Sequence, residues 1–425
     1  MATVLALDVG SSSVRAQVFD ARGEPVDELR QAAYRGDDPD EIVRLAREVI
    51  AGREADADAV GVSCFGHSLL ALDARGRPLT PVLGWRDVRS APQSKELRRR
   101  LDAAAVHART GQHLHPSYWP AKLAWLAETE PDVFGGAARF VSFADYLRGE
   151  PVTSVSIASG TGLLDLGTRG WDEELLECLG LDAERLPQLA DAPVWIDGVC
   201  ANLGAGCSGG RAALSVGTSG ALRILYETDR PRPRRGLFTY LVDERRAVEG
   251  GALSDGGNLR VWLDETLSAG GLARDDHGVT FLPFLGGERS TGWNPDAKGV
   301  VAGLTFATTP GDLRRAALEG VAFRFAAIAD LLPEIEEVVA TGAGLIHSPD
   351  WLQIMADALA RPVAVSAVPE ASLRGAAVAT LERMGHQVAE APVGEVFEPR
   401  AERADAYRSA RDRQQRLYEV LRAEQ

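Results

Sequence analysis

Two stretches of this chain carry the same order of residue types, and both could form a turn that binds phosphate. The first, ALDVGSSSVRAQVFD, lies near the start of the chain, and the second, LSVGTSGALRILYE, lies near its middle. With Gly10 placed on Gly217, each reads as an apolar strand, a glycine, small or hydroxyl residues and a second apolar strand. Only the first stretch has an acid before its glycine, because Asp8 stands where the second has Ser215.

A glycine followed by serine or threonine between two strands exposes backbone N–H groups, which form a concave anion site together with the hydroxyls. We therefore expect phosphate-binding turns at Gly10, Ser11 and Ser12 and at Gly217, Thr218 and Ser219. Two such turns across an interdomain cleft would hold one nucleoside triphosphate from both sides. Arg15, on the return strand, is in reach of a phosphate, with plain solvation as the alternative.

Asp8 explains why the two turns differ. A carboxylate beside phosphate is repelled unless a cation lies between them, and Mg²⁺ takes oxygen ligands of this kind. One metal ion needs one such anchor, so a single acid suffices. Either turn alone would be interpreted more simply as a tight hairpin, and it is the pair with its one acid that favours a nucleotide site.

Other nucleotide motifs are excluded by their context. The string GAGCSGG (Gly204–Gly210) satisfies GxGxxG, but it precedes a predicted strand, whereas the dinucleotide fingerprint follows a strand and opens a helix. We expect a loop there. No GxxxxGK[ST] string occurs, which excludes a P-loop enzyme.

Strands and helices alternate along the chain, which predicts an α/β fold. Residues 4–9 and 14–19 read as strands, residues 39–52 as an amphipathic helix with an acidic start, and residues 406–424 as an outer amphipathic helix. The repeated hairpin indicates a duplicated core with one copy in each half. We place the domain boundary at Asp197–Gly198, which gives domains of residues 1–197 and 198–425.

Composition narrows the class of protein. The 425 residues include 45% hydrophobic and 25% charged residues with a net charge of −15, as in a globular protein of two domains. No basic run is long enough to follow nucleic acid or an anionic membrane. The four cysteines form no CxxC pair, and neither a signal peptide nor a membrane span is apparent, so we expect a cytoplasmic protein.

The motifs together resemble sugar kinases of the FGGY carbohydrate kinase family. Besides DVGSSSVR and SVGTSG, residues 299–320 are similar to the family's second signature, and residues 340–363 resemble its adenosine motif, with a helix capped by Ser348. The resemblance implies two ribonuclease-H-like domains of the actin/Hsp70-like ATPase fold with an interdomain cleft. It implies ATP and Mg²⁺ as cofactors, Asp8 as the metal anchor, and Gly342 and Gly344 beside adenosine.

Within the family, TGQHLHPSYWPAKLAWL, GGALSDGGN and FLPFLGGERSTGWNPDAKG are most similar to gluconate kinases. The resemblance assigns Asp197 as the base that accepts the proton of a sugar hydroxyl, with helix capping as the alternative role. It implies a sugar site of His67, Trp85, Asp87, Arg89, Tyr118 and Asn258. Arg89 offers a cation for a carboxylate, although pairing with Asp87 is the alternative. For His67, the alternative is that it only braces its loop.

Two departures from the family pattern lie in the acceptor half. Trp119 replaces a smaller residue of the first signature, and Trp195 and Ile196 directly precede Asp197, where relatives have small residues after a longer segment. The predicted reaction is phosphorylation of D-gluconate to 6-phosphogluconate. The alternatives are a kinase for xylulose or another ketopentose, and a weakened nucleotide-binding regulator on the same fold. The expected partner is a small sugar or sugar acid, and the resemblance is compatible with a homodimer.

Overall fold

The computed structural model describes residues 2–268, 270–273 and 276–423. Its contacts divide the chain into two compact units, each assembled from separate segments. The first contains Met1–Ser208, Leu225–Glu249 and Val368–Ala391, and the second contains Gly209–Ile224, Gly250–Ala367 and Pro392–Gln425. A segment late in the sequence thus belongs to the first unit. The division that the sequence predicted after residue 197 stays a prediction.

The first sheet lies wholly in the first unit and has the strand order β3-β2-β1-β4-β9. Its strands are β1 (Thr3–Val9), β2 (Ser13–Asp20), β3 (Arg30–Ala33), β4 (Ala59–Cys64) and β9 (Val194–Ile196). Central β1 pairs antiparallel with β2 and parallel with β4. Its side chains from Val4 to Val9 are all buried, as expected of a strand covered on both faces. Asp8 is the one acid among them.

The second sheet has the strand order β12-β13-β11-β10-β16-β17-β18, and the division between units passes through β11 and β13. Its strands are β10 (Arg211–Val216), β11 (Gly220–Glu227), β12 (Phe238–Leu241), β13 (Arg246–Leu253), β16 (Glu337–Thr341), β17 (Val363–Ser366) and β18 (Val393–Phe397). Here β10 pairs antiparallel with β11 and parallel with β16, as β1 does with β2 and β4. The two sheets therefore repeat one local topology, as the two similar stretches of sequence predicted.

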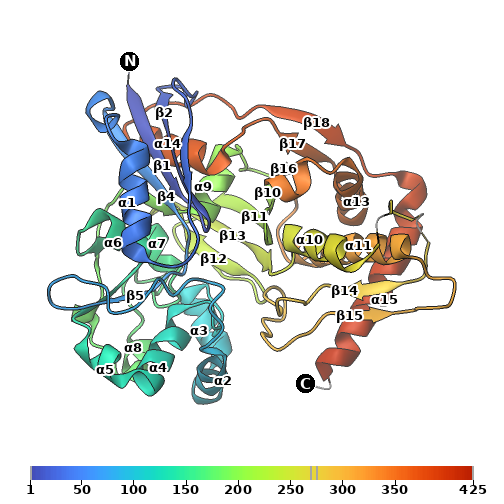
Figure 1. Cartoon of the computed structure of the whole chain (residues 1–425), viewed down its shortest axis with the longest axis horizontal. Coiled ribbons are helices and arrows are strands. Elements are labelled where there is room, and N and C mark those ends of the chain that lie inside the picture. Colours follow the sequence, from blue (N-terminus) through green and yellow to red (C-terminus); the bar gives the residue numbers. More distant parts are fainter. Residues whose placement is uncertain (1, 269, 274–275, 424–425) are drawn as a thin grey trace. The chain divides into compact units, whose positions relative to one another are not determined.

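Helices cover the first sheet in Figure 1. The predicted helix forms as α1 (Pro39–Ile50), whose start is capped by the Asp38 carboxylate, and it packs on β2 and β3. Late in the chain, α14 (Ala371–Arg383) packs on β1 and β4 and crosses α9 (Asp197–Gly204). A Cβ atom on Gly375 would lie 1.8 Å from the Cys200 carbonyl oxygen, so only glycine permits this crossing. The crossing fixes two helices that begin at Asp197 and directly after Glu370.

In the second unit, α11 (Pro310–Ala329) packs against α13 (Pro349–Leu359), the strand β14 (Thr280–Leu282) and α15 (Ala404–Ala423). Ser348 occupies the capping position of α13, as expected, although its hydroxyl makes no capping hydrogen bond. The expected loop after Gly204 is confirmed, because α9 ends there and turns lead to β10.

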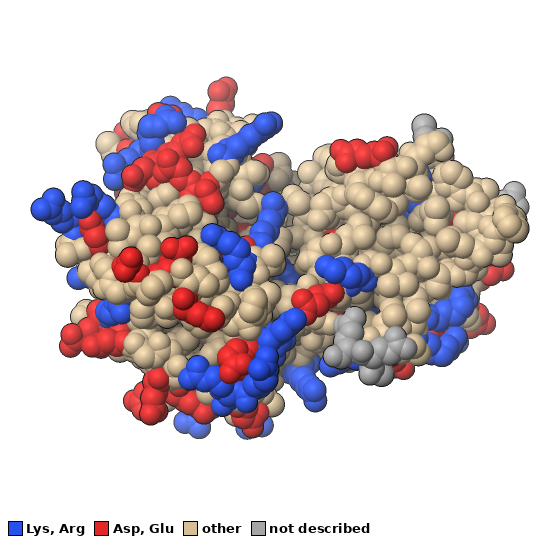
Figure 2. All heavy atoms as spheres, turned by 60° about the horizontal axis from the view of Figure 1, so that its bottom comes forward, with Lys and Arg blue, Asp and Glu red and all other residues tan. Residues whose placement is uncertain are grey.

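None of the helices among the described residues is both long and apolar enough to span a bilayer. On the face drawn in Figure 2, acidic and basic side chains are interspersed.

Candidate active site

Asp8 is a buried acidic residue on β1 of the first unit. It lies one residue before the end of β1, where its register neighbours are Arg15 on β2 and Ser63 on β4. Its side chain is buried, the Ser63 hydroxyl donates to Oδ1 at 2.6 Å, and Arg15 Nη2 lies 3.6 Å from Oδ2. Burial raises the pKa of Asp8 to about 6; Arg15 and Ser63 oppose this rise, and the charges of Asp197 and Glu370 add to it.

Arg15 bridges two acids from distant parts of the sequence. Besides approaching Asp8, its Nη1 forms a close ion pair with Glu370, the residue before α14. The pKa of Arg15 is raised because Asp8, Glu370 and Asp197 outweigh the partial burial of the guanidinium, which acts in the opposite direction. Arg15 therefore stays positively charged beside Asp8, at the base of the turn where phosphate was predicted.

The turn of Gly10, Ser11 and Ser12 is fixed by its backbone. The Gly10 amide donates to the Ser13 carbonyl at 3.0 Å, and Tyr34 donates to Ser12 through its amide and to Gly10 through its hydroxyl. Ser11 and Ser12 are exposed. The turn is thus held from behind, while its hydroxyl side chains face solvent.

The turn of Gly217, Thr218 and Ser219 has a similar closure, because the Gly217 amide donates to the Ser219 carbonyl at 3.0 Å. Its carbonyls accept from the start of α10 (Gly257–Thr266): Gly257 donates to Gly217 at 2.8 Å and Asn258 to Thr218 at 3.1 Å. In this unit too the turn is held from one side, and Gly217 and Thr218 are exposed.

Gly342 and Gly344, which were predicted to lie beside adenosine, pack closely against the end of β10 and the turn that follows it. A Cβ atom on Gly342, whose φ is +87°, would lie 2.5 Å from the Val216 carbonyl oxygen, and one on Gly344 would lie 2.9 Å from that of Gly217. The structure thus brings the predicted nucleotide residues of the second unit together.

The side chain of Asn258 forms hydrogen bonds with backbone groups at the start of α10. Its amide oxygen accepts from the backbone of Gly256 at 2.7 Å and of Leu259 at 2.8 Å, and its amide nitrogen donates to Ser254 at 3.1 Å. These bonds shape the start of α10. The assignment of Asn258 to the sugar stays a prediction.

Asp197 is the first residue of α9 and directly follows β9. Its Oδ1 accepts from the Gly198 amide at 2.7 Å, but Ile196 occupies the capping position of α9 and no side chain forms a capping hydrogen bond there, so the alternative that Asp197 caps this helix is wrong. Strand β9 runs parallel to β4, and β4 runs parallel to β1. Asp8, near the end of β1, and Asp197, directly after β9, therefore lie at the same end of the sheet. The short approach through Trp195 and Ile196 is a regular strand, since Ile196 pairs with Cys64.

His67 is held in an unusual backbone conformation, with a φ of +65°. Its Nδ1 lies 2.6 Å from the Gly160 carbonyl oxygen and its Nε2 3.2 Å from the Tyr240 hydroxyl, and its ring meets Tyr118 edge to face. Lys122 donates to the His67 carbonyl at 2.6 Å, and burial lowers the pKa of this lysine to about 7. These contacts define one cluster of a histidine, two tyrosines and a lysine within the first unit.

Asp87 and Arg89 bind each other. Arg89 Nη2 lies 2.6 Å from Asp87 Oδ2, and its guanidinium also stacks over Trp125. Partial burial opposes ionisation of Asp87, but the hydrogen bonds from Arg89 outweigh it and lower the carboxyl pKa. Trp85 is partly buried and its carbonyl accepts from Ser117 at 3.0 Å. The alternative that Arg89 pairs with Asp87 therefore describes the structure.

Trp119, a departure from the family pattern, belongs to the core. Its ring is buried among Leu69, Leu123 and their neighbours, and its Nε1 donates to the Ser68 carbonyl at 2.8 Å. Trp119 thus supports the loop that carries His67.

Models of known protein families match both halves of the chain. The N-terminal domain of the FGGY family of carbohydrate kinases matches residues 3–217, and the C-terminal domain matches residues 212–381. The chain belongs to the FGGY family of carbohydrate kinases. It is accordingly a phosphotransferase that uses ATP and a hydroxyl group of a small sugar as acceptor.

Individual relatives agree with this family. The chain is similar to a gluconokinase of Bacillus subtilis (28% identical, 90% of this chain and 88% of the relative) and to a xylulose kinase of Streptomyces coelicolor (32%, 88% and 86%). A crystal structure of gluconate kinase from Lactobacillus acidophilus matches with a TM-score of 0.86 at 24% identity, over 99% of this chain and 98% of that one. The predicted two-domain fold of the actin/Hsp70-like ATPase type is confirmed.

Sequence reasoning missed four residues of the first unit: Ser63, Lys122, Tyr240 and Glu370. Ser63 lies inside a strand and Glu370 lies 355 residues from Arg15, so neither stands near its partner in the sequence. Lys122 carried a usable signal, because it is one of only three lysines and stands amid the apolar residues of its helix.

Proposed function

We propose that this FGGY kinase transfers the γ-phosphoryl group of ATP to a terminal hydroxyl of an open-chain sugar acid, converting D-gluconate to 6-phosphogluconate. The observation that carries the chemistry is the buried Asp8 at the sheet edge that Asp197 also follows. The preference for gluconate is supported by the Bacillus gluconokinase, which matches over 90% of the chain, and by the GGALSDGGN stretch.

Asp197 is proposed to accept the proton of the attacking hydroxyl. A sugar hydroxyl is a weak nucleophile, and a carboxylate in hydrogen-bonding range assists its attack during phosphoryl transfer. One Asp197 oxygen accepts from the Gly198 amide at 2.7 Å, which orients the carboxylate at the start of α9. Proton removal and phosphate binding are thus assigned to different residues.

The residues around Asp8 fit a magnesium ion. The donors there are carboxylate and hydroxyl oxygens, which this cation prefers, and Mg²⁺ retains water ligands where the protein supplies only one or two carboxylates. No group of three histidine, cysteine or acidic side chains suited to a metal occurs among the described residues, so the proposed ion would depend on Asp8, the ATP phosphates and water. When bound, the ion would neutralise phosphate charge, while Arg15 remains charged beside Asp8.

The two turns are proposed to bind the phosphates through their amides and exposed hydroxyls, with Gly342 and Gly344 beside the adenosine. His67, Tyr118, Trp85 and Asp87 are proposed to contact the sugar. Arg89 is proposed to attract the carboxylate of gluconate; because Asp87 already binds Arg89, this requires a shared or exchanged ion pair. We also propose a cytoplasmic location and no nucleic-acid or membrane partner, and leave a homodimer as a compatible state.

A kinase for xylulose is the second candidate, since the Streptomyces xylulose kinase is 32% identical.

Release of ADP would be measured with Mg-ATP and gluconate, xylulose, ribulose or glycerol, and mass spectrometry would identify the phosphosugar. We expect the highest kcat/KM with gluconate and a loss of about 10²- to 10⁴-fold in kcat for Asp197→Asn. Higher turnover with xylulose would replace the substrate and keep the mechanism. ATP binding without any phosphosugar would instead favour a nucleotide-binding regulator.

A further inference from the structure

Lys122 is a buried lysine to which the proposed mechanism gives no role. It lies on α4 (Trp119–Thr129) in the first unit and is 1% exposed. Burial lowers the pKa of Lys122 to about 7, and the charge of Asp87 opposes this shift. Within the part of the chain that the structure describes, Lys122 forms no ion pair. A buried amino group without an acidic partner depends on its hydrogen bonds, so the atoms that Lys122 binds indicate its role.

The amino group of Lys122 binds two loops of the first unit. Its Nζ donates to the His67 carbonyl at 2.6 Å and to the Leu83 carbonyl at 2.9 Å. His67 lies in the first loop, residues 65–69, and Leu83 begins the second loop, residues 83–90. The two loops carry four of the residues proposed to bind the sugar: His67, Trp85, Asp87 and Arg89. One side chain therefore joins both parts of the proposed sugar site.

The start of α4 holds each loop by a further contact. The Trp119 indole donates from Nε1 to the Ser68 carbonyl of the first loop at 2.8 Å. The Ser117 hydroxyl donates to the Trp85 carbonyl of the second loop at 3.0 Å. Each of these two side chains binds one loop, whereas Lys122 binds both. Lys122 is thus placed to fix the first loop against the second.

The backbones of the two loops pair with each other at a different point. Leu69 and Leu83 exchange two hydrogen bonds, at 3.0 and 3.1 Å, but Leu69 lies two residues beyond His67. His67 itself has a φ of +65°, which is costly for a residue other than glycine. The hydrogen bond from Lys122 therefore supports the backbone at the strained residue whose ring is proposed to contact the sugar.

We propose that Lys122 is a positioning residue for sugar binding, because its amino group fixes the two loops in the arrangement that presents His67 and Asp87 to the sugar. It acts through the backbone of the loops and does not touch the substrate. The inference rests on the proposed function, which assigns these loops to the sugar. The turns proposed to bind ATP contain neither of the carbonyl groups that Lys122 binds, so the affinity for ATP should not depend on it.

Steady-state kinetics of Lys122→Met tests this role, because methionine has a similar shape but donates no hydrogen bond. We expect the KM for the sugar to rise about tenfold, with kcat and the KM for ATP within about threefold of wild type, since the lost interaction contributes to sugar binding alone. If Lys122→Met does not fold, Lys122→Gln, whose shorter side chain keeps an amide donor, should show the same selective rise. An unchanged KM for the sugar would overturn the proposal.

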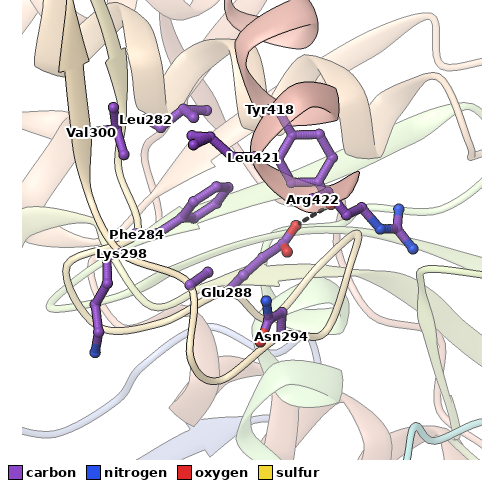
Figure 3. Close-up of a pocket in the computed structure, with 10 residues that line it drawn as sticks. Leu282, Phe284, Glu288, Asn294, Lys298, Val300, Tyr418, Leu421 and Arg422 are labelled. Carbon is purple, nitrogen blue, oxygen red and sulfur yellow. Dashed lines mark hydrogen bonds between the residues drawn. The ribbon is translucent and has the colours of Figure 1, made fainter. Parts of the chain in front are cut away.

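Two further variants serve as controls. Lys298→Met removes an exposed lysine of the second unit, which lines the cavity drawn in Figure 3, and should leave all three constants unchanged. Leu123→Val shortens a buried side chain next to Lys122, so it should lower the melting temperature but leave the KM for the sugar unchanged. Equal rises in this KM for Lys122→Met and Leu123→Val would contradict a positioning role, because a general loss of stability would explain both.

Hydrogen exchange followed by mass spectrometry separates this inference from the proposed function. Without substrate, the amides of residues 65–69 and 83–90 should exchange about tenfold faster in Lys122→Met than in wild type, and at the wild-type rate in Lys298→Met. If the wild type prefers another sugar, the KM is measured with that sugar. If it phosphorylates none, the proposed function fails, and exchange still tests whether Lys122 fixes the loops. Unchanged exchange in either loop would overturn the inference.

Discussion

The two hairpins place different chemistry on one scaffold. In the first unit, β1 carries Asp8 opposite Ser63 of β4, and the Ser63 hydroxyl donates to a buried carboxylate. In the second unit, β10 carries Ser215 opposite Thr341 of β16, and the two hydroxyls bind each other at 2.8 Å. At the corresponding position of the second sheet, the buried polar groups are therefore hydrogen-bonded without a carboxylate.

The neutral pair shows what the fold alone requires at this position. Burying a carboxylate costs free energy, as the raised pKa of Asp8 indicates, whereas two hydroxyls that bind each other cost little. The charged form of Asp8 therefore lowers the stability of the fold. A buried acid of this kind is a candidate functional residue, and we propose that it serves as the metal anchor at the turn of the first unit.

The largest expected effect is on catalysis in the first unit. Asp8→Asn keeps the shape and the hydrogen bond from Ser63 but removes the charge, so kcat should fall about 10³-fold through loss of the proposed metal anchor. The matched change, Ser215→Ala, removes only a neutral hydrogen bond and should leave kcat within about threefold. Steady-state kinetics with saturating ATP measures both. Equal losses would break the comparison, because the two positions would then contribute alike.

The next effect concerns how tightly the second turn is enclosed. Gly342→Ala places a Cβ atom 2.5 Å from the Val216 carbonyl oxygen at a φ of +87°, and should destabilise the protein by about 2 to 4 kcal/mol and weaken ATP binding. Gly385→Ala is the control, since its φ is +85° with no atom within 4 Å of the added Cβ, and should cost about 1 kcal/mol. Chemical denaturation would distinguish the two; similar costs would show that the contact with Val216 is unimportant.

A third effect follows from the pKa of Asp8, which burial raises to about 6 from an unfolded value near 4. Between these values the folded state binds more protons than the unfolded state, so this residue makes the protein less stable as pH rises from about 4 to about 6. Above pH 6 the full cost, about 3 kcal/mol, is present. Asp8→Asn should therefore melt at or above the wild-type temperature at pH 8.

The difference in melting temperature between Asp8→Asn and wild type should shrink as pH falls toward 4. Activity should move in the other direction, because the proposed metal anchor must be ionised, and kcat should fall as pH drops below about 6. A difference in melting temperature that does not change between pH 8 and pH 4 would show that Asp8 is not the titrating group.

The sequence predicted the parts of this comparison that are local. The glycine turns, the flanking strands and the single acid are contiguous in the chain, so residue types and their order were sufficient. The residues that contact these groups could not be predicted from the sequence in the same way. Glu370 reaches Arg15 only because α14 packs on β1, and Tyr240 reaches His67 from a strand of the second sheet. Such pairs depend on tertiary packing and therefore leave no pattern of residue spacing in the sequence from which they could be predicted.

The smallest effect tests the two turns directly. A Cβ atom on Gly217 would meet no atom within 4 Å, so Gly217→Ala should change stability by less than about 0.5 kcal/mol. If phosphate binds at this turn, the added methyl group should raise the KM for ATP about tenfold with little change in kcat, since it hinders binding without touching Asp8. A Cβ atom on Gly10 would instead lie 3.3 Å from Arg15 Nη2, so Gly10→Ala should lower kcat as well. An unchanged KM in Gly217→Ala would remove the second turn from the phosphate site and leave the charged hairpin as the one that binds phosphate.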